Sequence, residues 1–236
     1  MGDQTAIPRE NRLDPMADPR KLAWFGQIVR DRLLRHPSVR RIDTADAEIF
    51  EVEGFLKRRD CNEIVKVINR RATPSTLYRG TEREGFRTSF THHFEPHDPL
   101  TRSCELYISD LLGIDDNYSE TMQGQRYSTG QEFKHHFDYL HVGDGYWRDE
   151  AHRGGQRTWT AMICLHAPRE GGETDFPKLG LKFQPKVGTL LVWNNMTPQG
   201  FPNPKTLHAG TPVIRGTKHI ITKWYRQERW RLLNPV

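Results

Sequence analysis

The sequence predicts a mainly β fold with supporting helices, of the jelly-roll type in which two sheets face each other. Two observations lead to this prediction. From about residue 121 onward, short apolar segments are separated by turn-forming residues, as at Gly171-Gly172 and Arg215-Gly216, which is typical of strands. Helical periodicity is confined to the N-terminal half of the chain, so the helices are expected to support the sheets from one side.

The composition indicates one globular domain, or one domain with an extension. The chain has 236 residues, of which 35% are hydrophobic, and its 11 Phe, 7 Tyr and 6 Trp can supply a core. The net charge is +5, and no run of like charge reaches the length of a basic arm. This mild positive charge favours the attraction of anions, and we do not expect a nucleic-acid partner.

The cysteines and the apolar segments indicate where in the cell the protein is expected. Cys61, Cys104 and Cys164 are scattered, and they form neither a disulfide framework nor a zinc pattern, which fits a reducing environment. The first residues lack the apolar segment of a signal peptide, and no apolar run is long enough to span a membrane. We therefore expect a cytoplasmic protein without a membrane partner.

Three helices are expected before residue 113. Two begin with Asp followed by Pro, which offers a capping side chain and a residue suited to the first helical position. The other begins with a sequence that resembles a capping box. The expected helices run from Asp18-Pro19 to His36, from Asp60-Cys-Asn-Glu63 onward, and from Asp98-Pro99 to about Gly113. A short extended segment is expected over residues 49–55.

Seven strands are expected in the remainder of the chain, each bounded by Gly, Pro or Asn. They cover residues 121–129, 132–140, 157–166, 180–185, 187–194, 205–214 and 217–226. Residues 141–156 are expected to form a long loop beside the second of these strands, and loops of this length are often lids or binding loops.

Candidate metal ligands occur on two of the expected strands. In a strand, residues two apart point to the same face, so His136 and Asp138 would be directed at one point. His208 offers a third ligand. Two histidines and one carboxylate that leave coordination positions open are typical of non-haem Fe(II) oxygenases. The same ligands also bind zinc, so a zinc hydrolase remains an alternative at this point.

The flanking residues resemble those of one family. The matching motifs are Arg87-Thr-Ser89, Tyr127 with Gly130-Gln131, His136-x-Asp138-Tyr139, Gly154-Gly-Gln-Arg157 with Thr160, Gly171-Gly-Glu-Thr174-x-Phe-Pro177, His208-Ala-Gly210-x-Pro212 through Gly216-x-Lys218, and Lys223-Trp224. With these motifs the sequence resembles the prolyl 4-hydroxylase-like group of Fe(II)/2-oxoglutarate dioxygenases over about residues 46–226. The resemblance implies a double-stranded β-helix, with a dioxygenase domain over residues 46–236 that follows an N-terminal tail and helix over residues 1–45.

The resemblance also implies roles for individual residues. His136, Asp138 and His208 would be the catalytic iron ligands. Lys218 would pair with the distal carboxylate of 2-oxoglutarate, with Tyr127 and Thr174 as its hydrogen-bonding companions. A carboxylate that is buried in this way needs a charged partner. The positions that match the substrate groove of related hydroxylases are Arg157, Trp224, Arg87 and Ser89.

The implied reaction is hydroxylation of an aliphatic carbon in a peptidyl-proline-type substrate. It would use Fe(II), 2-oxoglutarate and O2, with ascorbate as a candidate further cofactor, and would release succinate and CO2. Phe133 stands where the family usually has Tyr, and Cys164 stands where an aromatic residue is frequent. These departures leave open a free amino acid or another small molecule as substrate. A non-catalytic binding module and a nucleic-acid dealkylase are further alternatives.

The spacing of His208 and Lys218 raises a geometric question. A two-residue hairpin at Arg215-Gly216 would pair Lys218 with Val213. Val213 is an odd number of residues from His208, so the two would face opposite sides of the sheet. The strands therefore require a bulge, a longer loop or a bend near Pro212, or else Lys218 reaches the site from another direction.

Overall fold

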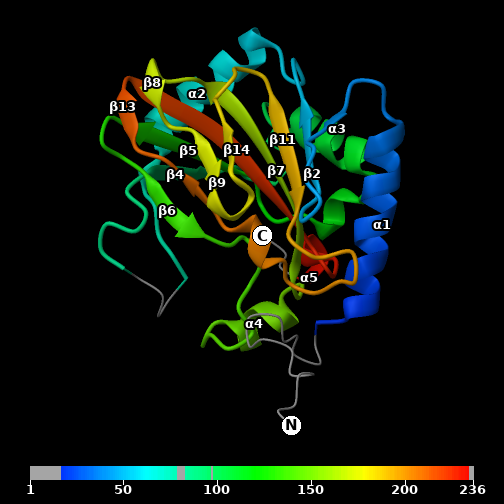
Figure 1. Ribbon diagram of the computed structural model, residues 1–236. Helices are drawn as coiled ribbons and strands as arrows, with labels where there is room; N and C mark the ends of the chain where they lie inside the picture. Colours follow the sequence, from blue (N-terminus) through cyan, green and yellow to red (C-terminus); the bar gives the residue numbers. More distant parts are fainter. Residues whose placement is uncertain (1–16, 79–82, 97, 234–236) are drawn as a thin grey trace.

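The structure consists of two antiparallel sheets that face each other, with helices behind the larger sheet (Figure 1). It is a computed structural model, and it describes residues 17–78, 83–96 and 98–233. The side chains that pack between the sheets include Ile49 and Leu191 from the larger sheet and Phe176 from the smaller one. This arrangement confirms the predicted jelly-roll fold with flanking helices.

The larger sheet has eight strands and the smaller sheet has four. In spatial order the larger sheet consists of β1 (Arg40–Arg41), β2 (Ile49–Val52), β11 (Leu190–Asn194), β7 (Arg157–His166), β14 (Thr217–Arg226), β5 (Gln123–Ser128), β4 (Phe90–His93) and β3 (Thr73–Pro74). The smaller sheet consists of β10 (Leu181–Phe183), β9 (Thr174–Phe176), β12 (His208–Gly210) and β6 (Phe133–His136). A separate pair is formed by β13 (Val213–Arg215) and β8 (Glu170–Gly171).

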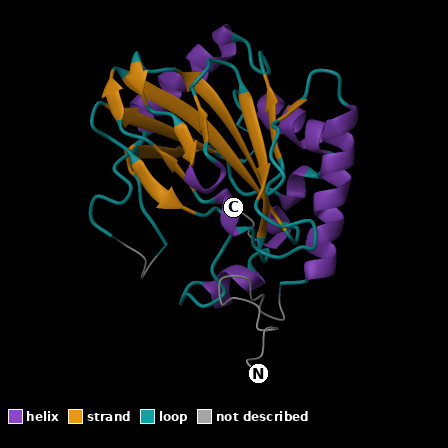
Figure 2. Ribbon diagram, in the orientation of Figure 1, coloured by secondary structure: helices purple, strands orange, loops and turns teal. Residues whose placement is uncertain are grey.

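Three longer helices lie on the outer face of the larger sheet, where Figure 2 shows them beside the strands. They are α1 (Pro19–Arg35), α2 (Arg58–Arg71) and α3 (Arg102–Leu112). Two short helices are α4 (Trp147–His152) and α5 (Trp230–Leu233), and a 3-10 turn, η2, spans Asp116–Tyr118. None of the described helices has the length and hydrophobicity that crossing a membrane requires.

The start of α1 is as predicted. The Asp18 carboxylate accepts a hydrogen bond from the backbone N–H of Arg20 at 2.9 Å, and Pro19 occupies the first turn. Phe25 and Val29 are buried in the main core together with side chains from α2 and β7. The expected boundary after residue 45 stays a prediction, and the expected tail up to residue 16 lies outside the described residues.

The other two predicted helix starts are wrong by two to four residues. The second helix begins at Arg58 after Lys57, so Asp60 lies within the first turn and forms no capping box. The third begins at Arg102, because the carboxylate and carbonyl of Asp98 form a turn that accepts the N–H groups of Leu100 and Arg102. It ends as predicted at Gly113, whose φ of 70° favours glycine.

The predicted strands were too long where the chain leaves a sheet. The strand expected over residues 132–140 ends at His136, so Asp138 lies in a bend just beyond β6. The strand expected over 205–214 is interrupted, and its two parts are β12 and β13. The expected loop over 141–156 contains α4, whose Trp147 is buried against Tyr139 and Leu140. The short strands β1, β3, β4, β8 and β9 were not predicted.

Strand β14 contributes to both sides of the larger sheet. Lys218, Ile220, Thr222 and Trp224 line the space between the sheets. Ile221 and Tyr225, which alternate with them, pack in the core beneath the helices. The alternation places two buried lysines, Lys218 and Lys223, on opposite faces of one strand.

The chain changes sheets between His208 and Lys218, which answers the geometric question raised above. His208 lies in β12 of the smaller sheet, whereas Lys218 pairs with Tyr127 across β14 and β5 in the larger sheet. Between them β13 pairs with β8, not with β14. The close approach requires Gly171, because a Cβ there would lie 2.4 Å from the Pro212 carbonyl oxygen, and its φ is 76°. Lys218 therefore faces the site from the opposite wall.

A buried charge cluster joins α3, η2, β14 and α5, and it gives a first prediction. Asp116 lies 2.7 Å from the Lys223 ammonium and is also paired with Arg102 and Arg231. Burial raises the pKa of Asp116, but these three cations outweigh burial and hold that pKa well below its usual range. We expect Asp116→Asn to lower the free energy of unfolding by about 3 kcal/mol at neutral pH.

The lowered pKa of Asp116 also determines how the stability lost in Asp116→Asn depends on pH. Because the pKa of Asp116 is lowered by folding, its stabilisation is complete above the ordinary Asp pKa of about 4 and is lost as the pH falls below it. Urea unfolding of both proteins between pH 7 and pH 3 should therefore show converging stabilities. Asp110→Asn is the control, because Asp110 forms an exposed pair with Arg32. A constant difference at all pH values would contradict the prediction.

Candidate active site

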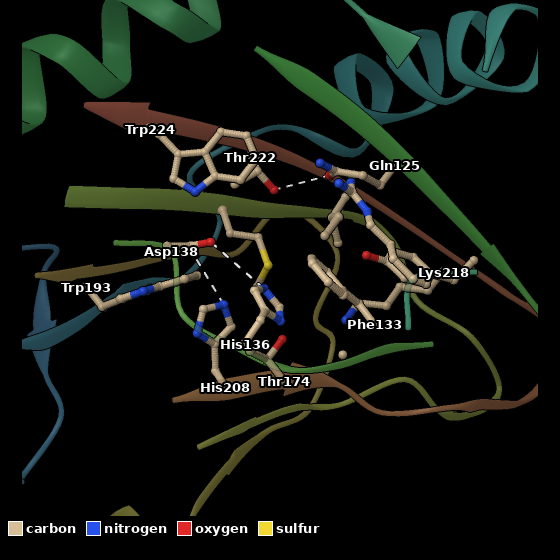
Figure 3. Close-up of a pocket in the computed structure, with 15 residues that line it drawn as sticks. Gln125, Phe133, His136, Asp138, Thr174, Trp193, His208, Lys218, Thr222 and Trp224 are labelled. Carbon is tan, nitrogen blue, oxygen red and sulfur yellow. Dashed lines mark hydrogen bonds and ion pairs between the residues drawn. The ribbon is translucent and has the colours of Figure 1, made fainter. Parts of the chain in front are cut away.

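A cavity of about 40 Å³ lies between the two sheets. Its lining includes His136 and His208 from the smaller sheet, Asp138 from the bend after β6, and Lys218 and Trp224 from β14 (Figure 3). We call it the site cavity. All three predicted metal ligands and the predicted 2-oxoglutarate anchor therefore face one enclosed space.

The three predicted ligands converge within the site cavity. His208 and His136 are paired directly across β12 and β6, and their ring centroids are 4.3 Å apart. The Asp138 oxygens lie 3.9 Å from Nε2 of His136 and 3.7 Å from Nε2 of His208. One ligand atom from each residue falls within 4.8 Å of the other two. Two imidazole nitrogens and a carboxylate oxygen at this separation can hold a divalent transition metal.

Backbone carbonyl groups orient both imidazole rings. Nδ1 of His136 lies 2.7 Å from the Lys134 carbonyl oxygen, and Nδ1 of His208 lies 2.9 Å from that of Thr206. Because a carbonyl only accepts, each Nδ1 must carry the proton, and each Nε2 directs its lone pair toward Asp138. Metal-ligating histidines are commonly held in this way.

Polar neighbours hold the carboxylate of Asp138 in place. Its Oδ2 accepts a hydrogen bond from the Thr160 hydroxyl at 2.8 Å, and the Asn195 amide in turn donates to that hydroxyl at 2.9 Å. Burial raises the pKa of Asp138, but the neighbouring His208 and His136 outweigh burial and lower that pKa. The carboxylate is therefore ionised and ready to bind a cation.

Aromatic side chains enclose the histidines. Phe133 stacks on His136 with ring centroids 3.5 Å apart, and Phe176 stacks on His208 at 5.3 Å. Trp193 meets His208 edge-on at 5.0 Å. Burial lowers the pKa of His136 to about 3, so its imidazole is neutral and able to bind a metal at physiological pH.

Lys218 is a buried cation without an anion beside it. Only 4% of the residue is exposed, and its ammonium makes no hydrogen bond or ion pair with another described residue. The ammonium lies 5.8 Å from the centre of the Tyr127 ring. Burial lowers the pKa of Lys218 to about 8, so it is still mostly charged at neutral pH. A buried charge of this kind needs a partner from outside the chain.

The residues that were predicted to accompany Lys218 are close to it. Tyr127 is its cross-strand neighbour, and Thr174 on β9 lines the same cavity from the smaller sheet. A Cβ at Gly172 would lie 3.3 Å from Lys218 Cδ, so this glycine leaves room for the lysine side chain. A cationic, a phenolic and a hydroxyl group therefore line the same cavity as the two histidines.

The four predicted substrate residues have different positions. Arg87 and Trp224 line the site cavity, whereas Ser89 and Arg157 do not. Arg87 donates to the hydroxyl groups of Ser89 and Thr91, at 3.3 and 3.1 Å, and lies 4.9 Å from the centre of the Phe133 ring. Ser89 therefore holds Arg87, and Arg87 in turn presents its guanidinium to the cavity.

Arg157 is engaged by another part of the chain. It forms two hydrogen bonds with the Glu120 carboxylate, at 2.6 and 2.8 Å, and donates to the Tyr78 hydroxyl at 3.0 Å. Its guanidinium lies 4.4 Å from the centre of the Trp224 ring. The indole N–H of Trp224 is buried and faces the Asp138 carboxylate, whose pKa it helps to lower. Arg157 therefore supports Trp224, which in turn is directed at Asp138.

Several residues of the site cavity were not singled out from the sequence as parts of a site. Ile220 and Thr222 lie at every second position between Lys218 and Trp224 on the same face of β14, and Gln125 is two residues before Tyr127 on β5. The period of two along each strand could have found all of them once Lys218 and Tyr127 were assigned to the inner face. Met162 and Trp193 give no comparable signal, because β7 and β11 are buried on both faces.

A double-sheet fold that encloses two histidines, a carboxylate and an unpaired lysine defines an oxygenase of the iron and 2-oxoacid type. The sequence model of the 2OG-Fe(II) oxygenase superfamily matches residues 122–226. A protein of Arabidopsis thaliana, named probable prolyl 4-hydroxylase 10, is 30% identical over 203 residues, which are 76% of this chain and 68% of that protein.

Two solved structures resemble this fold. One is the viral collagen prolyl hydroxylase of Paramecium bursaria Chlorella virus-1 in complex with 2-oxoglutarate; it is 28% identical, with a TM-score of 0.59, and the match covers 75% of this chain and 95% of that one. The other is a Trichoplax adhaerens prolyl hydroxylase, 16% identical, with a TM-score of 0.58 and coverage of 92% and 96%, which shows likeness of fold alone.

The chain belongs to the 2OG-Fe(II) oxygenase superfamily. Within it, the chain is a prolyl 4-hydroxylase-like enzyme, a 2-oxoglutarate-dependent dioxygenase that uses Fe(II), 2-oxoglutarate and O2. The resemblance predicted from the motifs is confirmed, and an enzyme is favoured over a non-catalytic binding module. The residues of the site cavity also fit Fe(II) and 2-oxoglutarate. The two histidines and Asp138 suit a ferrous ion, and Lys218 suits a carboxylate.

Proposed function

We propose that this enzyme hydroxylates an aliphatic carbon of a peptidyl-proline-type substrate and converts 2-oxoglutarate and O2 to succinate and CO2. The observation that carries the chemistry is the cluster of His136, Asp138 and His208 facing the unpaired Lys218 across one cavity. The proline specificity rests on the related proteins, which are named as prolyl 4-hydroxylases. The Fe(II), when bound, supplies the oxygen activation that no amino-acid side chain provides.

In this proposal the chain's own residues bind and orient. His136, Asp138 and His208 hold the metal from one side and leave coordination positions open toward the cavity. The keto-acid end of 2-oxoglutarate faces those positions, and its distal carboxylate pairs with Lys218. Tyr127 and Thr174 complete the hydrogen bonds of that carboxylate. Burial of the cavity between the sheets keeps bulk water from the reacting groups.

The substrate is proposed to enter beside Phe133 and Trp224. Both line the site cavity near the metal ligands, as Figure 3 shows. The Trp224 ring can pack against the substrate, and the Arg87 guanidinium can donate to a backbone carbonyl of a peptide. Arg157 acts as a positioning residue, because its guanidinium lies over the Trp224 ring and is itself held by Glu120.

The pH dependence of 2-oxoglutarate binding should reveal the state of Lys218. Since the pKa of Lys218 is about 8 in the unliganded protein, its ammonium is charged below that pH and becomes neutral above it. We expect the affinity for 2-oxoglutarate to be constant below pH 8 and to fall by about tenfold per pH unit above it. Lys218→Arg remains charged and should bind with little change over this range. An equal fall in both proteins would contradict the assignment.

The proposed substrate class can be tested directly by mass spectrometry. The Fe(II)-loaded enzyme is incubated with 2-oxoglutarate, O2 and either proline-containing peptides or the same peptides with alanine in place of proline. We expect the mass of one oxygen atom to be added only to the proline peptides, together with release of succinate. Release of succinate without any modified peptide would contradict a peptidyl-proline substrate and leave the oxygenase chemistry intact.

A free amino acid is the second candidate substrate, and Arg87 favours it. Its guanidinium lines the site cavity, and no described carboxylate forms an ion pair with it. The carboxylate of a free amino acid would supply such a partner. Hydroxylation of free proline with stronger dependence on Arg87 than peptide hydroxylation would support this candidate. Phe133, which lacks the hydroxyl usual in the family, is compatible with both.

We also propose a reducing, cytoplasmic environment for the chain. The support is that Cys61, Cys104 and Cys164 are all free and buried. A requirement for ascorbate stays a prediction, and omission of ascorbate from the assay tests it. Binding of an oligonucleotide that weakens steeply with salt would instead favour the nucleic-acid dealkylase alternative.

A further inference from the structure

A second buried charge cluster joins α4 to β7 and β14. It consists of two arginines and two glutamates, which are Arg157, Arg226, Glu120 and Glu150. Each of these residues is at most 9% exposed, and Arg226 is fully buried. We call it the α4 cluster, because Glu150 lies on α4. Its charges balance, and it lies apart from the cluster around Asp116.

Direct contacts within the α4 cluster lead from α4 to Arg157. Arg226 donates to the Glu150 carboxylate at 2.6 Å and to the Glu120 carboxylate at 3.1 Å. Glu120 also accepts the two hydrogen bonds from Arg157 described above. Arg157 and Arg226 are paired across β7 and β14, and like charges in such a pair repel each other. The glutamates therefore determine where both guanidinium groups lie.

Two tyrosines form a second connection between α4 and Arg157. Tyr146, the residue that precedes α4, stacks on Tyr78 with ring centroids 4.5 Å apart and an angle of 18° between the rings. The Tyr78 hydroxyl in turn accepts a hydrogen bond from Arg157 at 3.0 Å. Arg157 is therefore linked to the start of α4 through the tyrosines and to the middle of α4 through the α4 cluster.

Both connections end at the wall of the site cavity. The Arg157 guanidinium lies 4.4 Å from the centre of the Trp224 ring, and that ring lines the cavity next to Asp138 (Figure 3). The backbone N–H of Glu120 also donates to the Trp224 carbonyl oxygen at 2.8 Å. Buried ion pairs contribute little net stability compared with apolar packing. Stability alone therefore does not explain four buried charges here, whereas the placement of Trp224 does.

We propose that Glu150 and Tyr146 are positioning residues for substrate hydroxylation. Neither residue lines the site cavity, and both act through Arg157, which fixes the Trp224 ring against which the substrate packs. This inference rests on the proposed function, in which the substrate lies beside Trp224. It gives the segment over residues 141–156 a role in the reaction without contact to the substrate. A small displacement of a group that positions a substrate can lower the rate by about 100-fold.

The kinetics of Glu150→Gln in the full, Fe(II)-loaded enzyme test this inference. Glutamine keeps the shape of the side chain but removes the charge that pairs with Arg226. We expect kcat/KM to fall by about tenfold or more for a proline-containing peptide, or for free proline if the wild type hydroxylates only that. The 2-oxoglutarate requirement and the release of succinate without substrate should stay unchanged, because no member of the α4 cluster lines the site cavity.

Glu105→Gln is the matched control. Glu105 is also a buried acid, and it pairs with Lys223 and Arg231 in the cluster around Asp116. Its loss should lower the unfolding temperature to a similar extent and leave kcat/KM unchanged. An equal fall of kcat/KM in both variants, or no fall in Glu150→Gln, would overturn the inference and leave the proposed function intact. A wild type that hydroxylates neither substrate would overturn the proposed function, and the inference with it.

Tyr146→Leu gives a second test, which also serves if Glu150→Gln does not fold. The substitution leaves no buried charge unpaired, because it removes only the ring that stacks on Tyr78. We expect kcat/KM for the same substrate to fall by about threefold or more, again with an unchanged 2-oxoglutarate requirement. Tyr146→Phe keeps the ring and should retain the activity of the wild type. Full activity of the folded leucine variant would overturn the role of Tyr146.

Discussion

Asp138→Ala is expected to abolish the 2-oxoglutarate-dependent release of succinate, even when no substrate is present. The carboxylate is the only anionic member of the cluster with His136 and His208, and it cannot be replaced by the Thr160 hydroxyl that donates to it. Changes to groups that merely orient metal ligands cost about 10- to 100-fold, so loss of a ligand should cost more than about 100-fold. Succinate release and bound iron are the measurements.

The fold should survive this substitution. Folding lowers the pKa of Asp138, so its carboxylate contributes to the stability of the metal-free protein, and its loss also leaves the Thr160 hydroxyl without this acceptor. Thermal unfolding of the metal-free variant should therefore remain a cooperative transition with a lower midpoint than that of the wild type. Asp175→Ala is the matched control, because Asp175 lies on β9 and pairs with the exposed His135 outside the site cavity. Succinate release that persists in the Asp138 variant would remove Asp138 from the set of ligands.

Lys218→Met is expected to raise the concentration of 2-oxoglutarate required for half-maximal turnover by about 30-fold or more. Truncation of one partner of a buried charge pair costs about 2 kcal/mol or more, which corresponds to this factor. The metal-free variant should be at least as stable as the wild type, because an unpaired buried charge is removed from the core. Turnover as a function of 2-oxoglutarate concentration, together with thermal unfolding, separates the two effects.

Lys223→Met is the matched control for this experiment. Both lysines are buried on β14, but Lys223 faces the helices and is paired with Glu105 and Asp116 at 3.4 and 2.7 Å. Its loss should lower the free energy of unfolding by about 3 kcal/mol and leave the 2-oxoglutarate requirement of the folded enzyme unchanged. Equal changes in the 2-oxoglutarate requirement of both variants would contradict the assignment of Lys218 as the anchor.

The local features of the fold could be predicted from the sequence. Asp18-Pro19 and Gly113 mark helix ends through hydrogen bonds and backbone angles that involve only neighbouring residues. The starts at Arg58 and Arg102 were missed, because the Asp60 and Asp98 side chains are equally suited to first-turn and turn positions. Local chemistry therefore predicts the position of a helix end only to within a few residues.

Contacts between distant parts of the chain could not be predicted from the sequence. The spacing of His136 and Asp138 and the family motifs predicted which residues cluster as candidate ligands, but strand alternation could not show that β12 and β14 lie in different sheets. Which strand becomes a neighbour depends on the packing of the whole core. Arg157 shows the same limit, since the Glu120 carboxylate that engages it is 37 residues earlier in the chain.

The central place of β14 has a consequence for how the protein folds during its synthesis. Of the described strands, β14 comes last in the chain, yet it lies between β7 and β5 and joins the two halves of the larger sheet. Before it emerges from the ribosome, each half has an unpaired edge, and such edges invite pairing with other chains. Closure of the sheet therefore waits for β14, and we expect slow maturation that benefits from a chaperone.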